Sequence, residues 1–482
     1  MLNPKDIEDI YTLSPTQQGI LFQVLLAPNS GVYFDQQLCT LQGKLNISAF
    51  ASAWQNVVNR HPILRTGFVW EGLNKPVQIV HRQATIQIIE DDWSTLSATE
   101  QETYLQNYLQ SDRDRGFQLS EPPLMRLALF QIAENVHQLI WSTHHLVSDV
   151  WSDAIILKEV FAIYEAFEQN KSIDLPPTFL YRDYINWLKQ LHLTAAKNFW
   201  KTVLQDFKAP TLLGIDETNV NSSNLTESYG QQEVKFSVEL TAALQSLAKQ
   251  QHFTLNTLFT GAWSLLLSHY SGNNDVIFGT VFSGRPVNLT GVELMVGVFV
   301  NTLPTRVKLS PEDFLLPWLK SLHNQQINLH QYEHTPLAQI QNWSNIPQGL
   351  PLFESILVFQ NSKVDISQLS TPNIKIDNVR AFTTTNYPLS LTIVPDVNLW
   401  LNMSYDLRRF APATVAKILK HLEIVLRAMV TEPNVQIKTL IAMLNEVDKQ
   451  ENFAALESHR QLNANKLKNI QPKVIKSYSH PI

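Results

Sequence analysis

The sequence has almost no cysteine, no long apolar run and no cluster of basic residues. Cys39 is the single cysteine among 482 residues, so no disulfide can form within the chain and we expect a reducing compartment. No stretch of about 18 apolar residues is available to span a bilayer, and the N-terminus lacks the basic-then-apolar pattern of a signal peptide. These absences predict a cytoplasmic protein without a membrane segment.

Charge and composition indicate a large folded interior rather than a nucleic-acid surface. Lys+Arg 37 against Asp+Glu 43 gives a formal net charge of -6, and no basic run is interleaved with aromatic residues. A hydrophobic share of 44% with 11 Trp and 23 Phe predicts a well-filled core. The length exceeds one ordinary core, so we expect two or three structural units and no nucleic-acid partner.

Helix and strand patterns alternate through the first part of the chain. Ser14-Pro15-Thr16-Gln17 has the N-cap, first-turn proline and third-position glutamine of a helix start, and a second helix is expected from Asn46 to about His61. Short strands are expected at 68–70 and 77–81, and a hairpin at 125–133 and 137–143. This mixture predicts a two-layer α/β or α+β architecture.

A joint between two subdomains is expected at Asp174-Leu175-Pro176-Pro177, because consecutive prolines stop both helix and sheet. The second part is expected to contain helices at 181–187, 255–270 and 414–428, strands at 275–282, 352–360, 389–394 and 399–405, a polar loop at 214–230, and a helical or turn-like stretch at 296–306 that leads into a strand. After Glu446 the chain becomes polar and loses periodicity. The predicted division is 1–175, 176–446, and a tail or linker at 447–482.

The stretch from Thr143 to Ser152 (THHLVSDVWS) places two imidazoles and a carboxylate within six residues, where a strand gives way to a helix. The expected helix has one apolar stripe, formed by Ile156, Val160, Ile163 and Phe167. Side chains of residues 144–149 can therefore reach a cavity while rigid elements hold their backbone. A lone histidine in such a place is more often a satisfied polar residue than a catalytic one.

Five motifs in order give the sequence a recognisable pattern. They are Leu13-Ser14-Pro15-Thr16-Gln17-Gln18-Gly19, then Arg60 to Phe68 (RHPILRTGF), His144 to Asp149 (HHLVSD), Tyr181 to Trp187 (YRDYINW), and Val296 to Arg306 (VGVFVNTLPTR). Together they resemble the condensation domain of nonribosomal peptide synthetases, in the chloramphenicol-acetyltransferase-like superfamily. The resemblance implies two α/β subdomains, each an α+β two-layer sandwich, arranged in a V around a central channel.

The resemblance also implies site residues. His145 matches the catalytic histidine of the family, with His144 as support for its loop and Asp149 paired with an arginine, for which Arg285 in Ser283-Gly284-Arg285-Pro286 is the match. Further substrate-channel candidates are Val150, Trp151, Ser152, Asn301, Thr302 and Asn386. For Asn301 and Thr302 a role in forming a turn is an equal alternative.

The implied reaction is amide formation between a carrier-bound acyl or peptidyl thioester and the amine of a carrier-bound aminoacyl group. A thioester is already activated, so no cofactor or metal of the domain's own is expected; the 4'-phosphopantetheine arms come with the carrier proteins. Expected partners are upstream and downstream peptidyl carrier proteins and an adjacent adenylation domain, and the domain is expected to be a monomer. Adjacent histidines point apart and no third ligand has metal-site spacing, which argues against a metal at His144-His145.

Val150 departs from the family pattern, which usually has glycine after the aspartate. If the backbone needed a positive φ there, a β-branched residue would be strained, so we expect an ordinary φ or a slightly reshaped loop. The departure leaves open a non-catalytic platform of the same fold that docks carrier proteins. An acyltransferase acting on a free amine or alcohol is the other alternative, although the DFGWG motif of the plant-type relatives is missing.

Overall fold

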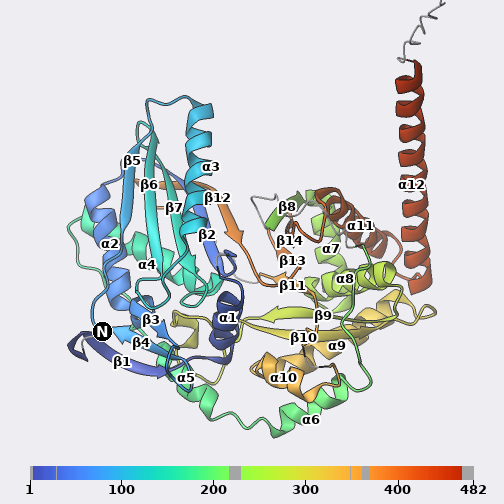
Figure 1. Ribbon diagram of the computed structural model, residues 1–482, viewed down its shortest axis with the longest axis horizontal. Coiled ribbons are helices and arrows are strands. Elements are labelled where there is room, and N and C mark those ends of the chain that lie inside the picture. The colour runs from blue at the N-terminus through green and yellow to red at the C-terminus, as the bar shows by residue number, and fades with distance from the viewer. Residues whose placement is uncertain (1–3, 29, 216–228, 348, 361–369, 469–482) are drawn as a thin grey trace, which may run out of the picture.

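The computed structural model describes residues 4–28, 30–215, 229–347, 349–360 and 370–468. They form two lobes, each built on a β-sheet that is covered by helices (Figure 1). This confirms the predicted mixed α/β fold of two lobes. Within the described residues, no helix is both long and apolar enough to cross a membrane.

The N-terminal lobe contains a five-stranded sheet in the order β12-β2-β7-β6-β5. Its strands are β2 (Phe34–Gln42), β5 (Ile88–Asp92), β6 (Met125–Ala133), β7 (Val136–His144) and β12 (Lys375–Thr383). Alternate residues of β6 point to opposite faces: Leu127 and Leu129 join the core under α2 and α4, whereas Ala128 and Phe130 join a smaller core under α3. The hairpin of β6 and β7 therefore forms as its period-two pattern predicts.

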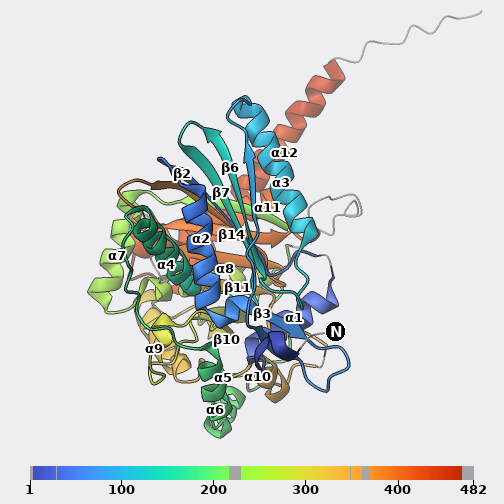
Figure 2. The same cartoon turned by 90° about the vertical axis from the view of Figure 1, so that its left-hand side faces the viewer.

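Helices cover both faces of this sheet. α2 (Ile47–Arg60) and α4 (Val150–Glu168) lie side by side over one face, and α3 (Ala98–Arg115) covers the other (Figure 2). The predicted caps are present, since Ser14 forms a capping box with Gln17 at α1 (Pro15–Leu26) and Asn46 caps α2. A three-stranded sheet completes the lobe, with β1 (Ile7–Thr12), β4 (Val77–His81) and β3 (Thr66–Val69) in that order.

The C-terminal lobe contains a six-stranded sheet in the order β10-β9-β11-β13-β14-β8. The strands are β8 (Tyr229–Lys235), β9 (Asp275–Phe282), β10 (Asn301–Lys308), β11 (Ser355–Phe359), β13 (Leu389–Val394) and β14 (Trp400–Asp406). One face packs on α7 (Val238–Gln251), α8 (Leu255–Ser271), α9 (Leu315–His330) and α11 (Pro412–Thr431). On the other face, α6 (Thr194–Val203) and α10 (Leu337–Trp343) pack against the β10-β9-β11 end. α5 (Tyr181–Lys189) packs with the N-terminal lobe's core.

Two details differ from the sequence-based expectations, and a third falls largely outside the described residues. Phe167 is 40% exposed and does not belong to the buried stripe of α4, where Phe161 and Tyr164 are buried instead. Residues 296–300 are neither helix nor strand, and the strand begins at Asn301. The polar loop expected at 214–230 falls largely outside the described residues, because 216–228 are not described.

Residues 447–468, the part of the chain after Glu446 that the structure describes, are helical. α12 runs from Ile437 to Lys468, through the predicted boundary at 446; its first part packs on the C-terminal lobe, and its C-terminal part projects away from the lobe in Figures 1 and 2. Beyond that boundary, Asp448 bonds His269 of α8 at 2.7 Å and Lys420 of α11 contacts Glu451 at 2.6 Å. These polar contacts attach α12 to the lobe where apolar residues become scarce.

Candidate active site

The HHxxxD stretch joins the end of β7 to the start of α4. Asp149 is the N-cap of α4, and its Oδ1 accepts a hydrogen bond from the Ser152 N–H at 2.9 Å. Val150 is the first residue of that helix and does not have a positive φ. The expectation of an ordinary backbone at Val150 is therefore confirmed, and the missing glycine causes no strain.

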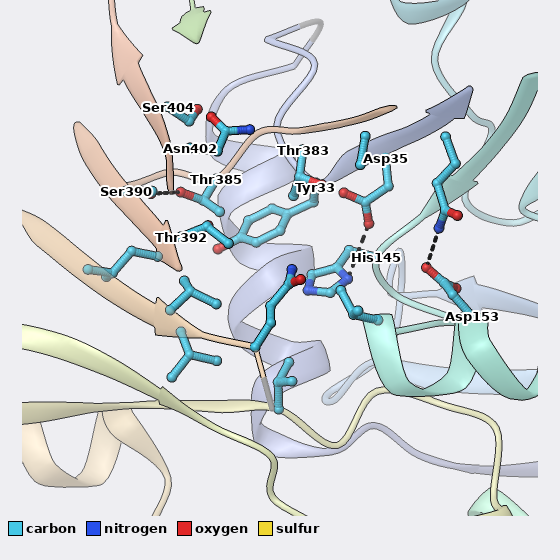
Figure 3. Close-up of a pocket in the computed structure, with 18 of the residues that line it drawn as sticks. Tyr33, Asp35, His145, Asp153, Thr383, Thr385, Ser390, Thr392, Asn402 and Ser404 are labelled. Carbon is cyan, nitrogen blue, oxygen red and sulfur yellow. Dashed lines mark hydrogen bonds and ion pairs between the residues drawn. The ribbon is translucent and has the colours of Figure 1, made fainter. Parts of the chain in front are cut away.

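His145 faces a large cavity between the two lobes. Its side chain is 17% exposed and lines a cavity of about 1810 Å³ that residues of both sheets share (Figure 3). Its Nδ1 lies 3.3 Å from Asp35 Oδ2 on β2, and its backbone N–H donates to the Tyr33 carbonyl oxygen at 2.9 Å. The Tyr33 ring stacks on the imidazole with centroids 6.1 Å apart. The ring is thus held from one side and open to the cavity through Nε2.

The two adjacent histidines have opposite electrostatic environments. Burial lowers the pKa of His144 to about 3, and its Nδ1 accepts the Leu146 N–H at 3.1 Å, so it is a neutral support for the loop. Burial also tends to lower the pKa of His145, but Asp35, with further contributions from Asp149 and Asp153, outweighs it and raises the pKa to about 9. At neutral pH His145 is therefore an imidazolium paired with a carboxylate.

Asp153 is a second buried carboxyl group beside this pair. Its Oδ2 accepts from Gln37 Nε2 at 2.6 Å, and its Oδ1 accepts from the Ser148 hydroxyl. Burial raises the pKa of Asp153 to about 8, assisted by the charges of Asp35 and Asp149 and opposed by the Ser148 hydrogen bond. The protonated form thus limits negative charge near His145 at neutral pH.

Asp149 and Arg285 meet across the lobes, as the resemblance implies. The Arg285 guanidinium lies 3.4 Å from Asp149 Oδ1 and donates to Ser152 Oγ at 3.0 Å and to the Met295 carbonyl oxygen at 2.9 Å. The Phe299 N–H donates to Asp149 Oδ2 at 2.9 Å, and the guanidinium stacks 4.0 Å from the Phe299 ring. These contacts clamp the start of α4 to the loop before β10.

The first motif braces the same junction. Thr16 Oγ1 donates to the Val300 carbonyl oxygen at 2.9 Å, and Gln17 Nε2 donates to the Leu146 carbonyl oxygen at 2.9 Å. The N-terminal turn of α1 therefore touches both the histidine loop and the loop of the other lobe.

The other predicted channel residues divide into two groups. Val150, Asn301 and Thr302 line the cavity. Trp151, Ser152 and Asn386 are not among its lining residues. Ser152 is buried within the Asp149–Arg285 contacts, the Trp151 Nε1–H donates to the Glu293 carbonyl oxygen at 3.0 Å, and Asn386 Oδ1 accepts from the Tyr33 hydroxyl at 2.5 Å, so a channel role for these three stays a prediction. Asn301 Nδ2 also donates to the Glu333 and Thr335 carbonyl oxygens, both at 2.8 Å.

Sequence reasoning missed Asp35, Tyr33 and Asp153. Asp35 is separated from His145 by 110 positions and reaches it only because β2 pairs with β7, where Asp35 lies opposite Thr143. Because β2 also carries Gln36, Gln37, Thr40 and Gln42, one acidic residue among them gave no local signal of its role.

The only group of three potential metal ligands among the described residues lies away from this cavity. It consists of His269, His421 and Asp448, on α8, α11 and α12. The Lys417 ammonium already contacts Asp448, and Lys420 bonds the adjacent Glu451. Because these lysines neutralise the two carboxylates, the group is better suited to attach α12 than to bind a cation.

Two lobes of this architecture, with one histidine facing the cavity between them, define the chloramphenicol-acetyltransferase-like class. The condensation domain family model matches residues 7–451, and the chain belongs to that family. It is a condensation domain of the kind found in nonribosomal peptide synthetases.

The chain spans only a part of the length of the synthase proteins that it matches. It is 40% identical over 446 residues to one of the linear gramicidin synthase proteins of Brevibacillus parabrevis, covering 92% of this chain and 9% of that protein. It is 32% identical over 450 residues to surfactin synthase subunit 3 of Bacillus subtilis (strain 168), covering 92% and 34%. Among solved structures, the starter condensation domain of rhizomide synthetase RzmA has a TM-score of 0.76 at 17% identity, covering 89% of this chain and 96% of that one.

Proposed function

We propose that this domain joins a donor acyl or peptidyl thioester on one carrier protein to the amine of an aminoacyl thioester on a second carrier protein. The amine nitrogen attacks the thioester carbonyl carbon, the C–S bond breaks, and the departing thiolate takes up the proton that the nitrogen loses. The 4'-phosphopantetheine arms of upstream and downstream carrier proteins would deliver both substrates. An adenylation domain would load the acceptor carrier.

The observation that supports this proposal is the placement of His145, which faces a cavity lined by both lobes while Asp35 holds its Nδ1. A cavity of about 1810 Å³ exceeds the roughly 300–1,000 Å³ of a typical small-ligand site and has room for two tethered substrates. Orienting two reactants in one site can supply much of the rate enhancement of such a reaction.

His145 is proposed as a positioning and charge-stabilising donor. Since the imidazole is protonated at neutral pH, Nε2–H is available to the carbonyl oxygen as that oxygen gains negative charge. The attacking α-amino group titrates near pH ~7.7–8.0, so a substantial fraction is neutral without help from a base. Because φ at Val150 is not positive, the missing glycine gives no reason to favour a non-catalytic platform.

The test uses two carrier proteins loaded with a donor and an acceptor, with the amide product measured by mass spectrometry. We expect His145→Ala to lower the rate by about 100-fold or more, in the range that a positioned proton donor contributes. His192→Ala is the matched control, because His192 does not line the cavity.

Two results would contradict the proposal. Turnover by His145→Ala within threefold of the unmodified protein would remove His145 from the reaction. A free amine or alcohol that serves as well as the carrier-bound acceptor would favour the free-acceptor alternative.

A further inference from the structure

One half of the C-terminal sheet presents a polar face to the cavity, although the opposite face of the same strands is part of the main core. Leu389, Leu391, Leu401 and Met403 pack into that core. The alternate positions of β13, β14 and β8 instead line the cavity. Six of these positions form what we call the polar wall: Ser390, Thr392, Asn402, Ser404, Gln231 and Glu233. The next row along the strands, Val394, Trp400 and Lys235, also lines the cavity and bounds the polar wall on one side.

The register of the strands makes the polar wall a continuous surface. Ser390 lies opposite Ser404, which lies opposite Gln231, and Thr392 lies opposite Asn402, which lies opposite Glu233. Three strands spaced by about 4.8 Å make this surface roughly 10 Å wide. The polar wall is therefore wide enough to contact more than one amino-acid residue of a bound chain.

The β9 and β11 part of the same sheet face is apolar or covered. At the β9 and β11 end, the cavity is lined by Val281, Ile356 and Val358, and helices α6 and α10 pack nearby. The change from apolar to polar side chains falls between β11 and β13, which pair in parallel with Ile356 opposite Ser390.

The polar wall is connected to the His145 site by a short series of contacts. Ser390 Oγ lies 3.0 Å from Thr385 Oγ1, and the neighbouring Asn386 accepts the hydroxyl of Tyr33, whose ring stacks on His145. Figure 3 shows Ser390, Thr392, Asn402 and Ser404 on the side of the cavity opposite Asp35, with Tyr33 and His145 between them. A chain attached at the reacting carbonyl could extend from His145 along this wall.

We propose that the polar wall binds the backbone of a peptidyl donor, and that the domain prefers a peptidyl over a fatty-acyl donor. This inference rests on the proposed function. A peptide brings an N–H and a C=O per residue, and each needs a partner when it leaves water. Hydroxyl and amide side chains supply both donors and acceptors. An aliphatic chain would instead displace water from these groups without replacing its hydrogen bonds.

The experiment compares two donors on the same carrier protein, an N-acetyl dipeptidyl thioester and an octanoyl thioester, with one loaded acceptor. The unmodified domain is expected to use the dipeptidyl donor at least tenfold faster. The variant Thr392→Val plus Asn402→Leu keeps the side-chain shapes but removes hydrogen-bonding groups. We expect it to reduce that ratio at least threefold by slowing the dipeptidyl donor alone.

Val281→Thr is the matched control, because it changes a cavity residue of similar shape at the apolar end of the sheet; its ratio should stay unchanged. Circular dichroism and Tm establish that each variant is folded.

Equal rates for the two donors in the unmodified domain would overturn the inference while leaving amide formation established. An equal loss with both donors in the double variant would overturn it too, because the wall would then serve the shared phosphopantetheine arm. No amide from either donor would overturn the proposed function and this inference together.

Discussion

At the scale of single residues, the site is organised by the charge pair of Asp35 and His145. Asp35 is buried at the start of β2, and its Oδ2 faces His145 Nδ1 at 3.3 Å. The neighbouring His144 is neutral and supports the loop. The two imidazoles differ in charge because His145 faces the Asp35 carboxylate, whereas His144 is buried and accepts a backbone N–H.

Replacing Asp35 by Asn should lower the pKa of His145 from about 9 toward its ordinary value, because the neighbouring negative charge is lost. Titration of ¹⁵N-labelled histidine side chains measures this pKa directly. Asp153→Asn is the comparison variant and should lower it less, since Asp153 is the last and smallest of the charges that act on His145. A His145 pKa that is unchanged in Asp35→Asn would show that the pair does not control the protonation of His145.

The same pair predicts a pH-dependent stability. The folded-state pKa of His145 is raised above its unfolded value of about 6.5, so the pair stabilises the fold fully below that pH and loses this contribution as pH rises through about 9. The Tm difference between Asp35→Asn and the unmodified domain should therefore be largest near pH ~6, shrink between pH ~6.5 and pH ~9, and be smallest above pH ~9. A difference that is constant across this range would contradict the assignment.

At the scale of elements, the start of α4 is held by the other lobe. Asp149 caps the helix with one oxygen and accepts the Phe299 N–H with the other, while the Arg285 guanidinium lies beside it. Gly284 makes this approach possible: it has φ +61, and a Cβ there would lie 1.8 Å from the Phe299 carbonyl oxygen. The cap of α4, the loop before β10 and the contact between the lobes therefore share the same residues, so a change to one affects the others.

Asp149→Ala should lower the free energy of unfolding by about 3–5 kcal/mol, because it leaves a buried guanidinium without its counter-charge. Denaturant titration measures this loss. Asp149→Asn also removes the counter-charge but keeps an oxygen for the helix cap, so its loss should be smaller than that of Asp149→Ala by the contribution of the cap, about 1 kcal/mol. Equal losses for the two variants would indicate that the charge pair, and not the cap, carries the stabilisation.

Asp448 and its neighbours add polar contacts to the apolar packing of Ile437, Leu440 and Leu444, which attaches the first part of α12 to the C-terminal lobe. Asp448→Asn should weaken the contacts with His269 and Lys417 and so raise the hydrogen-exchange rate of amides in residues 437–453. Glu446→Gln is the control on the same helix, because Glu446 and Lys449 form an exposed pair at 3.7 Å that contributes little. If Asp448→Asn exchanges no faster than Glu446→Gln, apolar packing alone holds the helix.

At the scale of the whole molecule, the second half of the chain contributes a strand to the sheet of the N-terminal lobe. β12, from the second half of the chain, forms the edge strand of the N-terminal sheet beside β2, as Figure 1 shows. The predicted division at 175 remains a prediction about units, but a cut there would remove this strand and expose β2 as a free edge.

A fragment of residues 1–175 is therefore expected to aggregate, whereas the same fragment with residues 370–385 attached by a flexible linker should remain monomeric for longer. Size-exclusion chromatography measures the monomer fraction, and a scrambled 370–385 segment is the control. Similar behaviour of the native and scrambled fusions would show that the strand contributes no specific pairing.

The sequence by itself determined the elements and the motif chemistry, because these depend on short-range patterns. The capping box at Ser14, the period-two hairpin before His144 and the position of the HHxxxD stretch between strand and helix all follow from residues within one element or turn. The family motifs also pointed to Asp149 and Arg285, which the fold brings to 3.4 Å.

Only the tertiary structure decided which distant residues surround His145. Asp35 and the polar wall reach the cavity through strand pairing between segments far apart in the chain, and nothing near them in the sequence specifies their neighbours. For the same reason, Trp151 and Ser152, adjacent to the motif, turn away from the cavity into the contacts that join the lobes. The surroundings of a side chain depend on every helix, strand and loop that packs around it, and a local sequence pattern does not specify which elements those are.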